Sequence, residues 1–117
     1  MLDLLFHATF AAFLAHELDA VAKHEWRVLP LTSFLPDALG ERVFVWLHLP
    51  IVMAVLHLGA EDGWFRTAFA GFAVAHVWLH WIYRRHPAYE FDNPGSRALI
   101  LLTGVLGGAY LAATFSA

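Results

Sequence analysis

The chain has 117 residues, of which 60% are hydrophobic and 15% charged, and its mean hydropathy is +0.59. These values are too apolar for a soluble domain of this size, so the sequence indicates an integral membrane protein. The net charge of -3, without a basic stripe, gives no support for nucleic acid as a partner, and the absence of cysteine excludes disulfide bonds.

Four stretches of mainly apolar residues follow one another along the chain, and each has the length of a membrane span, roughly 20 residues. They cover residues 2–24, 41–60, 64–86 and 96–116. We therefore expect an all-α fold in which residues 1–117 form a single membrane domain, a four-transmembrane-helix bundle. The expected location is a multi-pass protein of the bacterial inner membrane.

The breaks between these stretches have the composition of turns. The first loop contains Pro30 and Pro36 but is otherwise too apolar to extend into water, so we expect an interfacial segment between the first two helices. Residues 61–63 read Glu-Asp-Gly, a tight turn, and residues 92–95 read Asp-Asn-Pro-Gly at the end of the third loop. Ser96 is then the expected N-cap of the last helix.

Basic residues predict the orientation in the membrane. Six of the seven Lys and Arg residues flank the first and third loops, and only Arg66 lies near the second. Because positive charge is retained on the cytoplasmic side, we expect loops one and three to face the cytoplasm. Both termini then lie on the outer side.

Histidines lie at a common depth in three of the expected helices. At about 1.5 Å per residue, Glu17 lies roughly 12 Å from the inner end of the first helix and His48 about 10 Å from that of the second. His76 lies about 12 Å from the inner end of the third helix, and His80 follows one turn later on the same face. Ionisable groups at bilayer depth usually pair, coordinate an ion or line a pathway.

Imidazole and carboxylate are the ligands that zinc, iron and manganese take in helical bundles. The candidate metal ligands are His16, His48, His76 and His80. Glu17 and Asp19 are the candidate catalytic residues, either as a general base or as partners that orient a ligand histidine. Since His24, Glu25, His86 and Glu90 lie nearer the expected membrane surface, they are interpreted as solvated.

The stretch from Ala15 to Ala20 reads Ala-His-Glu-Leu-Asp-Ala, and residues 23–30 read Lys-His-Glu-Trp-Arg-Val-Leu-Pro. This segment resembles the small bacterial integral membrane proteins of the HXXEE type, which carry a first-helix histidine, two acids and a loop with Trp and Pro. His16 matches the motif histidine and Asp19 its first acid, whereas Ala20 stands where the second acid belongs. A weaker similarity extends from His76 to the Pro-Gly pair at residues 94–95. The resemblance implies the topology and a role for His16, but no reaction.

Three functions remain open. The first is a metal-dependent membrane enzyme acting on a lipophilic small molecule, the second a haem-binding or electron-transfer subunit, and the third a non-catalytic accessory or scaffold subunit. The histidine cluster is equally compatible with a buried hydrogen-bond network that holds the helices in register. The expected partners are the lipid bilayer, a lipophilic ligand and a homo-oligomer or larger complex.

The last helix carries small residues spaced by four, namely Gly104, Gly108 and Ala112. They predict a close contact between this helix and a neighbouring helix.

Overall fold

Four α-helices and one short 3-10 turn make up the computed structural model, which describes residues 1–117. The elements are α1 (Leu2–Ala22), η1 (Glu25–Arg27), α2 (Asp37–Glu61), α3 (Gly63–Tyr83) and α4 (Pro94–Phe115). The all-α prediction is confirmed, and no strand is present. The expected helices are all found with shifted ends; α2, for example, begins at Asp37 rather than at residue 41.

Three of the helices, α1, α2 and α4, are long and apolar enough to cross a membrane. Between 17% and 33% of their most apolar segments is buried inside the protein, so most of this apolar surface requires lipid around it. The sequence predicted four spans. The remaining helix, α3, has 21 residues, carries Arg66, His76 and His80, and is not among these three.

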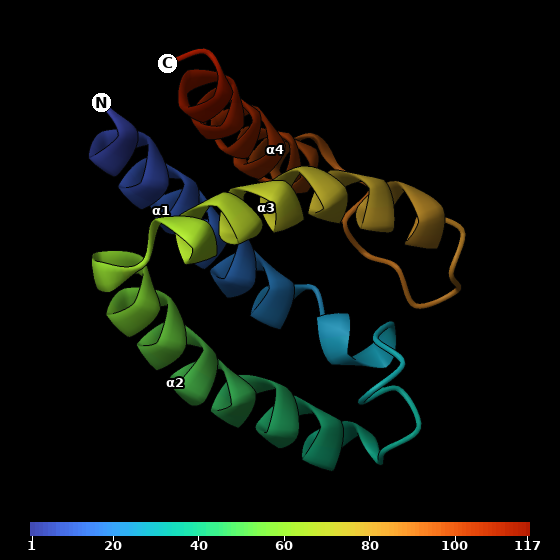
Figure 1. Ribbon diagram of the computed structural model, residues 1–117. Coiled ribbons are helices and arrows are strands. Elements are labelled where there is room, and N and C mark those ends of the chain that lie inside the picture. Colours follow the sequence, from blue (N-terminus) through green and yellow to red (C-terminus); the bar gives the residue numbers. More distant parts are fainter.

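Helix α4 lies against both α1 and α3, and these three helices form the compact part of the bundle (Figure 1). Helix α2 diverges from α3 beyond the turn that joins them and contacts the rest mainly through η1 and α3 (Figure 1). One core cluster lies near the η1 end and comprises Ala20, Trp26, Phe44, Phe91 and Ile100. A second cluster lies toward the termini and comprises Phe6, Val55, Ala70 and Tyr110.

The close contact between α3 and α4 runs through Gly104 and Gly107. A Cβ on Gly107 would lie 2.7 Å from the Ala70 carbonyl oxygen and 2.8 Å from the Ala73 Cβ, and one on Gly104 would overlap the Val77 side chain. A Cβ on Gly108 would meet only Val74, at 4.0 Å. The predicted close contact is therefore confirmed at Gly104, but it continues through Gly107 rather than through Gly108.

The N-cap of α4 is Asn93, not Ser96 as the sequence predicted. The Asn93 side chain accepts a hydrogen bond from the Ser96 backbone N–H at 2.9 Å, and its amide donates to Ser96 Oγ, also at 2.9 Å. Ser96 Oγ in turn donates to Asp19 Oδ2 at 2.6 Å. This chain of bonds fixes the start of α4 against the end of α1.

Candidate metal centre

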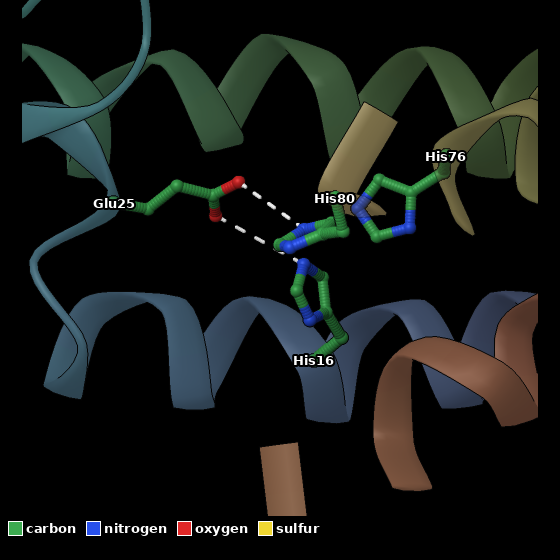
Figure 2. Close-up of side chains that lie close together, drawn as sticks. All are labelled: His16, Glu25, His76 and His80. Carbon is green, nitrogen blue, oxygen red and sulfur yellow. Dashed lines mark ion pairs between the residues drawn. The ribbon is translucent and has the colours of Figure 1, made fainter. Parts of the chain in front are cut away.

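Four side chains from three segments converge in the bundle (Figure 2). His16 comes from α1, His76 and His80 come from adjacent turns of α3, and Glu25 comes from η1. One nitrogen or oxygen from each of the four lies within 4.8 Å of those of the other three. The ring centroids of His16, His76 and His80 are 4.5–4.9 Å apart, so the rings touch one another.

The group is almost fully enclosed by protein. The exposed fraction is 0% for His16, 6% for His76, 7% for His80 and 9% for Glu25. Both ring nitrogens of His16, Nδ1 of His76 and Oε2 of Glu25 are buried without a hydrogen-bond partner. Since a buried polar atom without a partner costs roughly 1–3 kcal/mol, such a concentration in one place is unfavourable unless a further group satisfies these atoms.

The spacing is compatible with coordination of one ion. Glu25 Oε2 lies 3.9 Å from His16 Nε2, and Glu25 Oε1 lies 3.7 Å from His80 Nε2. Two ligands that each lie about 2.1 Å from a zinc ion are at most about 4.2 Å apart. Both Glu25–His distances fall within this limit, but they are too long for direct hydrogen bonds.

A left-handed turn at His24 brings Glu25 into the group. His24 has φ 55° and ψ 46°, a conformation that is uncommon for residues other than glycine. The turn ends α1 and directs the following 3-10 turn back toward the bundle. The His24 ring is held by a 2.6 Å contact between its Nδ1 and the Glu90 carboxylate, which links this turn to the loop between α3 and α4.

Burial alters the acidity of Glu25. Desolvation is the main cause that raises the pKa of Glu25, to about 8, and the nearby negative charge of Glu17 raises it further. The protein alone therefore disfavours the carboxylate form at this position. A bound cation would have the opposite effect and favour the ionised carboxylate.

The surroundings of His80 fix the orientation of its ring. The Tyr89 hydroxyl is hydrogen-bonded to His80 Nδ1 at 3.1 Å, which leaves Nε2 directed at the group. Phe91 packs against the rings of His80 and His16, at centroid distances of 4.8 and 5.6 Å, and Phe13 packs against His76 at 4.8 Å. Partners at the second nitrogen of a ligand histidine, within an apolar shell, are typical of metal centres.

The other predicted site residues lie outside this group. His48 Nε2 is hydrogen-bonded to Glu17 Oε2 at 2.7 Å, and His48 Nδ1 donates to the Phe44 carbonyl oxygen at 2.7 Å. Both nitrogens of His48 are thus engaged by oxygen atoms, and neither is free to bind an ion. Asp19 accepts from Ser96, as described above, and is directed at α4.

A cavity of about 450 Å³ lies beside the histidines, between α1, α2 and α3. Most of its 23 lining residues, 17 of them, are hydrophobic. Its polar lining residues include Glu17, Glu25, His48, His76 and His80. The volume falls within the range of about 300–1,000 Å³ that is usual for small-molecule sites. One face of the candidate metal centre is therefore accessible to an apolar ligand.

Depth along the helices identified His16, His76 and His80, which the structure brings together. Glu25 was missed, and its interpretation as a solvated surface residue was wrong, because the side chain is buried. Helical periodicity ends at Ala22, and nothing in the sequence indicates the left-handed turn at His24. The one available signal was the acidic residue directly after an apolar helix that carries a buried histidine.

The chain belongs to a protein family of unknown function, DUF6713, whose family model matches residues 2–117. No curated protein and no solved structure matches the chain.

Proposed function

We propose that this member of the DUF6713 family is a metal-dependent membrane enzyme that acts on a lipophilic substrate. His16, His76, His80 and Glu25 would hold one divalent ion. The observation that carries the proposal is the convergence of buried ring nitrogens and a carboxylate oxygen that have no hydrogen-bond partner in the protein. Three imidazoles and one carboxylate suit zinc, iron or manganese.

The cavity supports an enzymatic role rather than a closed structural site. His76, His80 and Glu25 contribute to the cavity wall, so a substrate in the cavity would lie next to the ion. A divalent ion in this position supplies a Lewis acid that can polarise a bound oxygen atom. Catalytic metal sites keep such an open position, and four protein ligands leave one on an ion that takes five or six ligands, as iron and manganese do.

Glu17 is the proposed proton-transfer residue. It lines the cavity together with His48, and the two share a hydrogen bond of 2.7 Å. Because His48 also donates to the Phe44 carbonyl oxygen, a proton lies between the ring and the carboxylate and is available for exchange with a substrate. For Asp19 we propose a positioning role, since Ser96 binds its carboxylate and links α1 to α4.

The geometry favours an ion over the alternative of a haem group. The rings of His16 and His76 are in contact, with centroids 4.6 Å apart, which leaves no space for a macrocycle between them. The third alternative, a non-catalytic scaffold subunit, is the expected outcome if the protein binds no metal.

Two further predictions from the sequence are retained as proposals: the HXXEE-type relationship around His16 and a location in the bacterial inner membrane.

The test is turnover of a membrane lipid extract by the purified protein. Samples loaded with zinc, iron or manganese are incubated with the extract, and the lipids are compared by mass spectrometry. We expect one lipid class to be consumed and a product to form with the metal-loaded parent, and neither change with His80→Ala. If every loaded form leaves the lipid composition unchanged, the enzymatic proposal fails.

A further inference from the structure

The cavity beside the histidines is divided into a polar level and an apolar region. Glu17, His48 and His76 mark the polar level on three different helices. Seven residues away on the same helices, toward the end of the bundle where the termini lie, the lining consists of Phe10, Val55 and Phe69. Seven helical residues correspond to about 10.5 Å. An apolar sleeve of roughly this depth therefore extends from the polar level toward the termini.

Aromatic rings form one wall of this sleeve. Phe69 contacts Phe10 and Phe13, with centroids 6.2 and 5.4 Å apart, and Phe13 stacks on Phe72 at 5.6 Å. No ionisable side chain lines the cavity on this side of Glu17, His48 and His76. The sleeve is thus suited to a hydrocarbon chain, while an oxygen-bearing end group would be accommodated at the histidines and Glu25.

A second cavity, of about 340 Å³, lies between α1 and α2 and shares Leu14, Glu17, His48 and Val52 with the first. Its remaining lining residues include Leu18 and Val45, which are exposed apolar residues of two predicted membrane spans. The hydrogen bond between His48 and Glu17 is the only side-chain bond that joins α1 to α2. The two cavities therefore adjoin across these shared residues, with the histidine cluster on one side and the lipid-facing side of α1 and α2 on the other.

We propose that the cavity binds a single-chain membrane lipid that enters laterally from the bilayer between α1 and α2. The hydrocarbon chain occupies the sleeve up to Phe10, Val55 and Phe69, and the oxygen-bearing end group lies at the histidine cluster. This inference rests on the proposed function and specifies its substrate class. It also assigns Leu14 and Val52, which line both cavities, as the residues that control access.

The experiment uses the full chain in bilayers that contain a medium-chain fatty acid with a diazirine group near its methyl end. After illumination, labelled peptides are identified by mass spectrometry, and the metal content of the same samples is measured. In the parent, the label is expected on the segments that contain Phe10, Val55 and Phe69. Leu14→Trp and Val52→Trp each fill the space where the two cavities adjoin and should lower this labelling at least about tenfold, the effect of a loss of about 1.4 kcal/mol in binding.

Leu56→Trp is the matched control, because Leu56 is an exposed α2 residue that lines neither cavity. It should leave labelling unchanged, and all three Trp variants should keep the metal content of the parent, which also shows that they are folded. Labelling of the sleeve without bound metal would support the lipid site and overturn the proposed metal function. Metal binding with the label confined to lipid-facing residues, or equal labelling in all variants, would overturn the lipid site and leave the metal function standing.

Discussion

Tyr89 controls which nitrogen of His80 is available in the cluster. The hydrogen bond between its hydroxyl and His80 Nδ1 leaves Nε2 directed at Glu25, 3.7 Å from Oε1. Tyr89 is itself partly enclosed, and burial is the main cause that raises the pKa of its hydroxyl to about 12. The hydroxyl therefore stays protonated over the physiological range, and the bond to the ring persists.

Tyr89→Phe should weaken metal binding without abolishing it. The substitution removes only the hydroxyl that orients the His80 ring, and losses of such partners typically cost on the order of 10–100-fold in affinity. Competition with a chelator of known affinity measures the change. Tyr83→Phe is the control, because Tyr83 also lines the cavity but makes no side-chain hydrogen bond. Equal affinities of Tyr89→Phe and the parent would show that the bond does not orient a ligand.

Residue depth along a helix could be calculated from the sequence, and this was sufficient to place His16, His76 and His80 at nearby levels. Which group each histidine side chain contacts could not be calculated in this way. His48 lies at the same level but is bound to Glu17 and to the Phe44 carbonyl oxygen. Depth alone does not distinguish a histidine of the cluster from one that is bound outside it. Glu25 depends on the backbone conformation of His24, which the local sequence does not specify.

The helix elements were predictable because each contains a long apolar stretch bounded by Pro, Gly or acidic residues. The face of each helix that packs against the other helices was less predictable. Helices α1, α2 and α4 are apolar on nearly all sides, as expected for helices that contact lipid over most of their surface. The sequence then offers little contrast from which to identify the packed face, and this explains why the contact on α4 was assigned to Gly108 instead of Gly107.

Gly107→Ala should destabilise the protein, while Gly108→Ala should not. The added methyl group on Gly107 would collide with the backbone of Ala70 and with Ala73, and overpacking of this kind typically costs about 1–3 kcal/mol. On Gly108 the methyl group meets only Val74 at 4.0 Å, and the higher helix propensity of alanine should then stabilise α4 slightly. Thermal unfolding in detergent measures both variants. A larger loss in Gly108→Ala would contradict the described contact between α3 and α4.

In the whole molecule, the candidate metal centre lies nearer one end of the bundle. At this end, η1 meets the loop between α3 and α4 (Figure 1). This is the end at which six of the seven basic residues lie, so we propose that it faces the cytoplasm. The termini and the turn between α2 and α3 then lie on the outer side. The lipid sleeve would extend from the cytoplasmic half of the membrane toward the outer half.

Cysteine labelling tests this orientation directly, since the chain has no native cysteine. Glu61→Cys places an exposed thiol near the turn between α2 and α3 without disturbing Asp62, which caps α3. Ser33→Cys places one in the first loop with almost no change in size. An impermeant thiol reagent added to intact cells should label Glu61→Cys and not Ser33→Cys. The reverse pattern would place the histidine cluster near the outer face.

The metal content of the purified protein tests the central claim. The protein is prepared without a histidine tag or chelator, supplied with iron, zinc and manganese, and analysed for bound elements. The parent should hold a single ion per chain, His16→Ala and His76→Ala should lose it, and His48→Ala should retain it, because His48 bonds to Glu17 outside the cluster. Absence of stoichiometric metal in the parent would contradict the claim and identify the cluster as a polar network. Metal lost in His48→Ala but kept in His16→Ala and His76→Ala would contradict the assigned ligands.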